Sequence, residues 1–332
     1  MPKKRMNSIQ NPHLKFDFLA LGESVVDFIS SDPVANLGEA AYFERFAGGQ
    51  VANLAMNMAR LGNRVALGSC VGEDGFGQLI RQKVGAAGVD LSCLQISSEA
   101  PTTLIPVTRT TRGTPDFSVY RGADTCLQPN ENLLDAAAHS GIVHTSAFAL
   151  SREPARSTIL QALEVARQNG QRVSLDPNFH PRIWPDVADF KAILQAAFRY
   201  VNITKPSLDD CIRLFGAGFE PAEYAAHFLQ WGAEIVAISL GAEGTFLATH
   251  TGEQYRLVPN LISVADVTGA GDAFWSGFLT ALLDGHSPLD AIRSGQVVAE
   301  IKISRIGPLT ANLDRTEIFS KAQLIQYQTC HM

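Results

Sequence analysis

The chain has 332 residues, of which 46% are hydrophobic and 18% charged, with a formal net charge of −6. This length and composition are typical of a globular protein that buries about three-quarters of its unfolded surface. The negative charge argues against non-specific nucleic-acid binding, and the lack of any run of 18 apolar residues argues against a membrane span. The five cysteines form no Cys-x-x-Cys pair, which favours reduced thiols and a cytoplasmic location.

The first predicted strand covers residues 16–21 and ends at a glycine. Residues 1–14 carry basic side chains but no apolar run, so we expect a disordered tail there rather than a signal peptide. In open α/β sheets, ligands bind beyond the carboxyl ends of the strands, which is where Asp27 falls. Asp27 is therefore either a carboxylate that binds ligand hydroxyls or a surface acid at a strand end.

Two glycines, Gly48 and Gly49, precede a predicted helix that presents small residues on one face. Such a pair lets the backbone approach a ligand closely, although on its own it usually marks only a turn. Residues 33–46 and 102–121 interrupt the alternation of strands and helices. We expect these two insertions, with strands at 102–107 and 116–120 around a turn at 112–115, to form a small separate sheet.

Strands and helices alternate regularly after Gly141, which indicates a parallel sheet with right-handed crossovers. The strands expected there are 142–145, 172–176, 200–203 and 235–240, and the helices are 153–169, 186–198, 208–215, 221–232 and 288–305.

The first half of segment 265–279 is rich in glycine and small polar residues, which predicts a turn, and its second half has the apolar pattern of a helix. The Gly269–Gly271 backbone is thereby placed at a helix N-terminus, where free N–H groups and the helix dipole favour an anion. Asp272 stands beside that anion. It is either the base that accepts a proton during phosphoryl transfer or an acid placed to favour the dipole, and the residues alone leave both interpretations open.

Asp-x-Thr-Gly-Ala-Gly-Asp at 266–272 resembles the C-terminal signature of the ribokinase-like (PfkB-type) carbohydrate kinases. Gly-Gly-x-x-x-Asn at 48–53 resembles the N-terminal signature of the same family. The resemblance covers roughly residues 16–310. It implies a three-layer α/β/α fold with a mainly parallel central sheet and a small β-sheet lid that covers the sugar.

The same resemblance implies how the chain is divided and assembled. The main nucleotide- and sugar-binding domain comprises residues 15–32, 47–101 and 122–328, and the lid comprises residues 33–46 and 102–121. The lid of such kinases is often a dimer surface, so we expect a homodimer formed through it.

The family signatures also imply roles for individual residues. Asp272 corresponds to the catalytic base, and the amides of Gly269, Ala270 and Gly271 to the anion hole. The implied sugar-binding residues are Asp27, Gly48, Gly49, Asn53, Arg121 and Asp272. The implied nucleotide-binding residues are Lys205, Ser207, Ser239, Gly241, Gly244, Gly269, Gly271 and Gln296. ATP and Mg²⁺ are the implied cofactors, with Asp210 holding Mg²⁺ through water, and a monovalent cation such as K⁺ is expected at Asp266 and Thr268.

Some positions depart from the family pattern. His180 stands where many sugar kinases have Arg, with Arg182 two residues further on, and Gln296 replaces a common Asn. Ser207 and Asp210 stand where relatives usually carry Asn and Glu, and they also fit a helix N-cap, a role compatible with the metal role.

These features predict an ATP-dependent sugar kinase that acts on fructose, because Lys-x-Ser-x-x-acid at 205–210 and Tyr-Arg at 120–121 look most like fructokinases. Ketodeoxygluconate and ribose are the alternative acceptors. A catalytically silent sugar-sensing regulator is a different alternative, but it is expected to lose the base that Asp272 retains. A dinucleotide oxidoreductase and a Walker-type kinase are disfavoured, because Gly-x-Gly-x-x-Gly does not follow the first strand and no Gly-x₄-Gly-Lys-Ser/Thr occurs.

Overall fold

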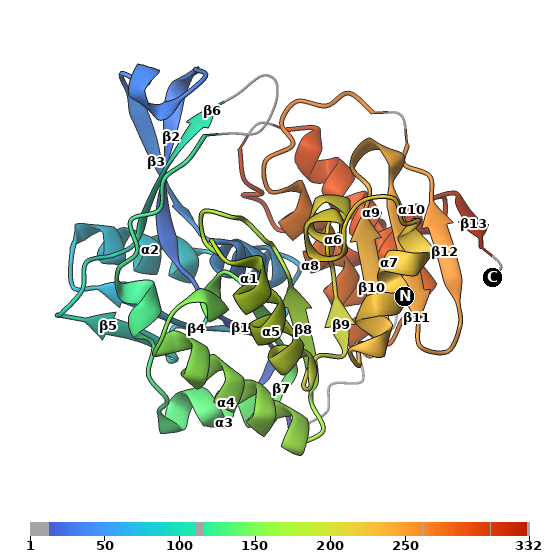
Figure 1. The fold of residues 1–332 in the computed structure, drawn as a ribbon, viewed down its shortest axis with the longest axis horizontal. Coiled ribbons are helices and arrows are strands. Elements are labelled where there is room, and N and C mark those ends of the chain that lie inside the picture. The colour runs from blue at the N-terminus through green and yellow to red at the C-terminus, as the bar shows by residue number, and fades with distance from the viewer. Residues whose placement is uncertain (1–12, 110–115, 261, 306, 331–332) are drawn as a thin grey trace, which may run out of the picture.

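The protein folds around one large and one small β-sheet (Figure 1). The computed structural model describes residues 13–109, 116–260, 262–305 and 307–330. The expected turn at 112–115 and residues 1–12 of the expected tail lie outside the described residues.

The large sheet has ten strands, and those from β10 to β5 run parallel. Three further strands, β11 to β13, extend one edge in antiparallel pairs. In spatial order the strands are β13 (Tyr327–Thr329), β12 (Gln254–Leu257), β11 (Thr245–Thr249), β10 (Ile235–Ser239), β9 (Ile203–Thr204), β8 (Arg172–Asp176), β7 (Ser140–Ser146), β1 (Phe16–Leu21), β4 (Val65–Gly72) and β5 (Leu94–Ser97).

Helices cover both faces of this sheet. On one face lie α3 (Glu131–Ala138), α4 (Ala155–Gln168), α5 (Val187–Phe198), α6 (Leu208–Phe215) and α7 (Pro221–Gln230). On the other lie α1 (Gln50–Arg60), α2 (Gly75–Ala86), α8 (Ala270–Leu283), α9 (Pro288–Ile303) and α10 (Arg315–Ala322). None of the described helices is long and apolar enough to cross a membrane.

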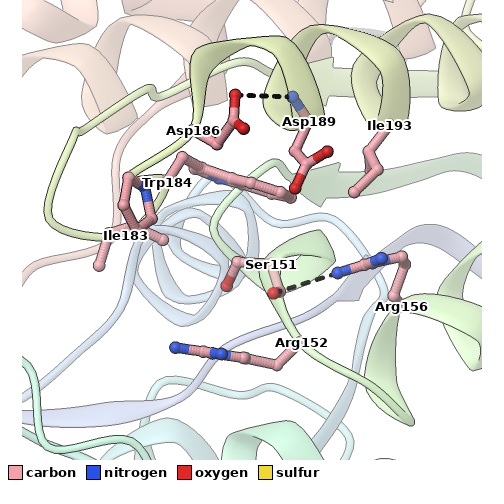
Figure 2. A pocket seen from close by; sticks show the side chains of 9 residues that line it. Ser151, Arg152, Arg156, Ile183, Trp184, Asp186, Asp189 and Ile193 are labelled. Carbon is pink, nitrogen blue, oxygen red and sulfur yellow. Dashed lines mark hydrogen bonds between the residues drawn. The ribbon is translucent and has the colours of Figure 1, made fainter.

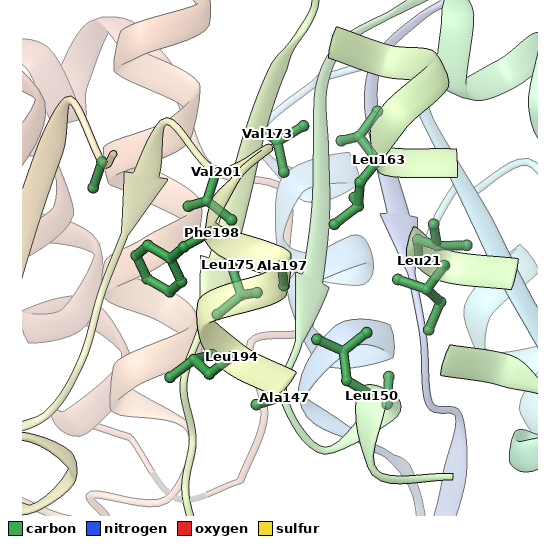
Figure 3. Close-up of a cluster of buried hydrophobic side chains, with 14 of the residues drawn as sticks. Leu21, Ala147, Leu150, Leu163, Val173, Leu175, Leu194, Ala197, Phe198 and Val201 are labelled. Atoms are coloured by element: carbon green, nitrogen blue, oxygen red, sulfur yellow. The ribbon is translucent and has the colours of Figure 1, made fainter. Parts of the chain in front are cut away.

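The side-chain alternation of β1 explains the two layers. Leu19 and Leu21 join the cluster under α3 to α7, whereas Phe18 and Ala20 join the cluster under α1 and α8 to α10. Figure 3 shows part of the first cluster, which includes Leu194 of α5 together with Val173 and Leu175 of β8. The predicted three-layer α/β/α fold with a mainly parallel central sheet is confirmed.

The small sheet consists of β2 (Val25–Pro33), β3 (Phe43–Gly48) and β6 (Leu104–Arg109), with β2 in the centre. Residues 117 and 120 pair with β6 only through isolated bridges, so the expected strand 116–120 is not continuous. The sequence pattern places residues up to 32 in the main domain. In the structure the chain leaves the large sheet after Leu21, and β2 belongs to the small sheet.

Several elements differ from the sequence prediction. The strand expected at 200–203 is reduced to Ile203–Thr204, because the chain first makes a turn at the end of α5. Helices α3 and α10 and strands β5, β11, β12 and β13 were not among the predicted elements.

Helices α8 and α9 pack with their backbones unusually close together. A Cβ atom at Gly277 would lie 2.8 Å from the carbonyl oxygen of Ser294 and 2.7 Å from Cγ2 of Val298. A Cβ atom at Gly295 would lie 2.8 Å from the carbonyl oxygen of Phe274. Glycine at both positions therefore fixes the distance between α9 and the helix that begins at the Gly269–Gly271 turn.

We predict that Gly277→Ala lowers the free energy of unfolding by about 1–3 kcal/mol, because the new methyl group overpacks the α8–α9 contact. Denaturant titration measures this. Gly85→Ala is the matched control, since a Cβ atom there meets only Leu91 at 3.5 Å, and it should be neutral or stabilise by up to about 1 kcal/mol. Equal stability of Gly277→Ala and the parent would contradict the close packing.

Candidate active site

The turn before α8 presents free N–H groups next to Asp272. Gly269 caps the helix with φ of 74°, a left-handed conformation that glycine adopts without strain. The N–H of Ala270 donates to the carbonyl oxygen of Val267 at 3.1 Å. Within the described chain, the N–H groups of Gly271 and Asp272 have no protein acceptor, so they are the ones available to an anion.

Asp272 is half-buried, and its carboxyl group lies among charged neighbours. Burial raises its pKa to about 7, and the negative charges of Asp176 and Glu23 act in the same direction. The Lys205 ammonium and a hydrogen bond from Asn53 oppose this rise. A carboxyl group that titrates near neutral pH can take up and release a proton under physiological conditions.

Lys205 brings a buried positive charge to the same place. Its side chain is only 7% exposed, and Nζ forms an ion pair with Asp176 Oδ2 at 2.8 Å. Nζ also lies 3.6 Å from where a Cβ atom on Gly271 would be, so the ammonium group stands beside the free amide. Burial alone would lower the pKa of Lys205, but the carboxylates of Asp176, Asp272 and Asp210 raise it, which keeps the ammonium group charged.

Asp27 of β2 lies against the glycine pair. A Cβ atom at Gly48 would be 1.9 Å from Asp27 Oδ2, so only glycine leaves room for this carboxyl group. Burial raises the pKa of Asp27 to about 7, and none of the described residues forms a hydrogen bond or ion pair with its side chain. Such an unpartnered carboxyl group is suited to accept hydrogen bonds from a ligand.

Glu23, which carried no predicted site role, is buried next to the second glycine. Its carboxylate accepts hydrogen bonds from the N–H of Val51 at 3.3 Å and from Ser146 Oγ at 2.7 Å. Burial raises its pKa to about 7. A Cβ atom on Gly49 would meet the Glu23 carbonyl oxygen at 2.8 Å, so Glu23 packs against the turn that begins α1, the helix that carries Asn53.

A buried polar chain links the helices of the two signatures beneath the site. His144 of β7 contacts Gln50 of α1 through Nε2 at 3.3 Å and Ser174 Oγ through Nδ1 at 2.9 Å. Trp275 of α8 donates to the same Ser174 hydroxyl at 3.1 Å. Burial lowers the pKa of His144 to about 3, so the imidazole is neutral. No local motif marks this chain of contacts.

Arg121 is fixed by three groups. Its guanidinium pairs with Asp124 at 2.6 Å, donates to Ser151 Oγ at 2.6 Å and stacks on the Phe148 ring at 4.3 Å. Ser151 also lines a cavity of about 530 Å³. Figure 2 shows that Ser151 and Arg152, which precede α4, and Arg156 of α4 face side chains around the start of α5. The lining residues are Ser151, Arg152, Arg156, Ile183, Trp184, Pro185, Asp186, Asp189 and Ile193.

His180 and Arg182 contact a segment that lies beside the small sheet. Arg182 forms an ion pair with Asp116 at 2.8 Å and donates to the carbonyl oxygen of Phe117. The His180 ring lies 4.4 Å from the Phe117 ring. These two residues therefore join the loop after β8 to the segment that pairs with β6.

The predicted nucleotide-binding residues other than Gly269 and Gly271 lie at or just after the ends of β9 and β10 and on α9. Ser207 caps α6 and pairs with Ser239 through an isolated bridge. Gly241 begins the short 3₁₀ helix after β10, and Gly244 follows that helix. Gln296 is buried, and its amide donates to Glu300 at 3.0 Å.

Asp210 is part of a helix cap. Its Oδ2 accepts hydrogen bonds from the N–H of Ser207 at 2.9 Å and from Ser207 Oγ at 2.6 Å, and its Oδ1 accepts one from Phe179 N–H at 2.8 Å. The described residues contain no cluster of three metal-binding side chains. With Oδ2 occupied in the cap and Oδ1 bonded to Phe179, Asp210 fits Mg²⁺ only through water, which suits an ion held mainly by nucleotide phosphates.

The Asp266 turn contains a buried ammonium group. Lys302 Nζ donates to the Asp266 carbonyl oxygen at 3.0 Å and to Asp266 Oδ2 at 3.1 Å. The N–H of Thr268 donates to Asp266 Oδ1 at 2.9 Å. Lys302 was not predicted, because a pair 36 residues apart leaves no local spacing signal.

Comparison with known proteins finds a family that covers most of the chain. The model of the pfkB family carbohydrate kinases matches residues 15–315. An ATP-dependent 6-phosphofructokinase of Thermoanaerobacterium thermosaccharolyticum is 32% identical over 295 residues, 89% of this chain and 90% of that relative. A 2-dehydro-3-deoxygluconokinase of Bacillus subtilis is 30% identical over 92% of this chain and 95% of its own.

Solved structures show the same fold. The fructokinase of Halothermothrix orenii superposes with a TM-score of 0.75, at 34% identity over 88% of this chain and 100% of that chain. A putative ribokinase II from E. coli, solved in complex with ATP and Mg²⁺, superposes with a TM-score of 0.81, at 23% identity over 93% of this chain and 99% of that chain. From the family match and these relatives, the chain belongs to the pfkB family of carbohydrate kinases.

Proposed function

We propose that this sugar kinase transfers the γ-phosphate of ATP to a hydroxyl group of fructose. The observation that carries the proposal is the meeting of three groups at one helix N-terminus. They are the Asp272 carboxyl group, the free N–H groups of the first turn of α8, and the buried ammonium group of Lys205. Phosphoryl transfer requires a base and an anion-stabilising site side by side.

In the proposed reaction, Asp272 accepts the proton of the attacking hydroxyl group. The hydroxyl oxygen forms a bond to the γ-phosphorus as the bond to the leaving ADP oxygen breaks. The N–H groups around Gly271 and the Lys205 ammonium stabilise the negative charge on the transferring group. Mg²⁺ bound with the nucleotide would supply further positive charge, and Asp210 would hold its water shell.

The sugar is proposed to lie between the glycine pair and Asp272. Asp27 offers two unpartnered oxygens, and Asn53 places an amide next to Asp272. Arg121 is held on the same side by Asp124, whose negative charge also acts on Glu23. The adenosine part of ATP is proposed to contact Ser239, Gly241, Gly244 and Gln296.

Fructose is proposed because the Lys205–Asp210 and Tyr120–Arg121 segments resemble fructokinases, and because the H. orenii fructokinase is 34% identical. 2-Keto-3-deoxygluconate is the second candidate, supported by the B. subtilis relative, and ribose the third. A sugar-sensing regulator without turnover remains the candidate of a different class.

We further propose that the small sheet closes over the sugar and forms a homodimer interface. Tyr42, Phe43 and Tyr120 all belong to or adjoin this sheet and are 75%, 37% and 64% exposed. Tyr42 and Phe43 lie at one edge of the sheet and Tyr120 beside the opposite edge, and exposed aromatic side chains are enriched at protein–protein contacts. All five cysteines are free thiols, which supports the proposed cytoplasmic location.

The proposed function is tested by a coupled ADP-release assay against a panel of acceptors. The panel contains fructose, fructose 6-phosphate, 2-keto-3-deoxygluconate, ribose, glucose, tagatose and nucleosides. The proposal expects the highest kcat/KM with fructose. A higher value with another acceptor would reassign the substrate, and no turnover with any acceptor would favour the regulator.

Asp272→Asn should lower kcat by about 10²–10⁴-fold, the usual contribution of a positioned acid–base group. Asn keeps the size and one acceptor oxygen, so the melting temperature and the affinities for ATP and sugar should be retained. Steady-state kinetics and calorimetric binding measure both properties. Turnover within about fivefold of the parent, a loss of only about 1 kcal/mol, would mean that Asp272 is not the base.

Asp27→Ala should raise the sugar KM by about 5- to 150-fold, because sugar donors left unpaired cost roughly 1–3 kcal/mol. ATP affinity, measured by direct binding, should change little. Asp32→Ala is the matched control, since Asp32 lies exposed on the same strand and should leave both constants unchanged. Equal weakening of sugar and ATP binding by Asp27→Ala would place Asp27 outside the sugar site.

A further inference from the structure

The turn that leads into the anion site is held by a lysine side chain from α9. Lys302 lies in the last turn of α9, and its side chain is only 4% exposed. Its Nζ donates to both the carbonyl oxygen and the carboxylate of Asp266, and its Cε lies 3.9 Å from where a Cβ atom on Gly269 would be. The Lys302 side chain thus contacts Asp266 through its ammonium group and passes close to Gly269 through its stem.

Other contacts complete the anchoring of this turn. The N–H groups of Ala265 and Asp266 both donate to the carbonyl oxygen of Ile303, at 2.7 and 3.2 Å. The N–H of Gly307 donates to Asp266 Oδ2 at 3.1 Å. The Asp266 carboxylate therefore accepts from Lys302, Gly307 and Thr268 together.

A monovalent cation does not fit these oxygens. A cation at Asp266 would need the same carbonyl and carboxylate oxygens that accept from Lys302 Nζ. It would also stand next to a positive charge in a poorly solvated place, where repulsion between like charges is strong. The cation expected at Asp266 and Thr268 therefore disagrees with the contacts found there.

We propose that the Lys302 ammonium group takes the place of a monovalent cation, and that it positions the 265–269 turn so that the N–H groups around Gly271 point at the transferring phosphate. Lys302 is a positioning residue, because it acts through the turn rather than on the substrate. The enzyme should consequently need no K⁺. This inference rests on the proposed function only for its turnover measurements.

The wild-type protein is tested first, in the chlorides of K⁺, Na⁺ and tetramethylammonium at matched ionic strength. Turnover should agree within about twofold among the three salts, and the melting temperature should not depend on K⁺. A tenfold or larger activation by K⁺ over tetramethylammonium would overturn the proposal.

Lys302→Met removes the charge but keeps the apolar stem. It should lower kcat by about 10- to 100-fold, as the loss of an outer positioning group commonly does. Added K⁺ or NH₄⁺ should restore part of the activity and raise the melting temperature of this variant in a saturable manner, whereas tetramethylammonium should do neither. The melting-temperature measurement is independent of catalysis, so it separates failure of this inference from failure of the proposed function.

Two further variants complete the test. Lys302→Arg keeps a positive charge, so its turnover should remain independent of added cations. This variant keeps the proposal testable if Lys302→Met does not fold. Lys83→Met, on the exposed surface of α2, is the matched control and should behave like the parent. Wild-type turnover of Lys302→Met without added cations, or loss of activity and stability that no cation restores, would contradict the proposal.

Discussion

The site depends on a balance of charge around the buried ammonium group of Lys205. Three carboxyl groups, those of Asp176, Asp210 and Asp272, act on it, and Asp176 pairs with it directly at 2.8 Å. A buried ammonium group without such partners would lose its proton, and a buried carboxyl group without the ammonium would stay protonated to higher pH. The ammonium group and the carboxylates therefore stabilise each other's charged forms, and together they lie at the N-terminus of α8.

The fold delivers these groups from distant parts of the chain. The ends of β8 and β9 supply Asp176 and Lys205, and α8 supplies Asp272. The close α8–α9 packing through Gly277 sets the position of the helix. The contact of Lys302 with Asp266 fixes the position of the turn that precedes α8. Ligands of parallel α/β sheets bind at this edge because all these segments end there.

Much of the fold followed from local patterns, because strand and helix periods are local properties. The predicted bounds 172–176 and 208–215 agree with β8 and α6 residue for residue. Which sheet a strand joins depends on long-range pairing, so local patterns did not show that β2 belongs to the small sheet. The antiparallel strands β11 to β13 also went unpredicted.

The signatures indicate the candidate site but not its surroundings. Asp272 and Asn53, more than 200 residues apart in the sequence, are brought into hydrogen-bonding contact. Glu23, by contrast, has no sequence feature that marks it as a site residue, and only the fold shows that it is buried against Ser146. The same is true of Lys302, whose partner Asp266 belongs to a different element. Burial and pairing of charges are properties of the assembled structure, which local spacing does not encode.

The most direct test of this account is the pH dependence of kcat at saturating concentrations of the preferred sugar and ATP, which reports the groups that act once both substrates are bound. Burial raises the pKa of Asp272 to about 7, and the base must be unprotonated to act. The account therefore predicts a rate that is level above about pH 7 and falls about tenfold per pH unit below it. Lys205→Met should move this acid limb to higher pH, since the ammonium lowers the pKa of Asp272. Asp27→Asn should retain the limb, because Asp27 only binds the sugar. A profile that stays level from pH 5 to 8, or an acid limb that Lys205→Met leaves in place, would contradict the account.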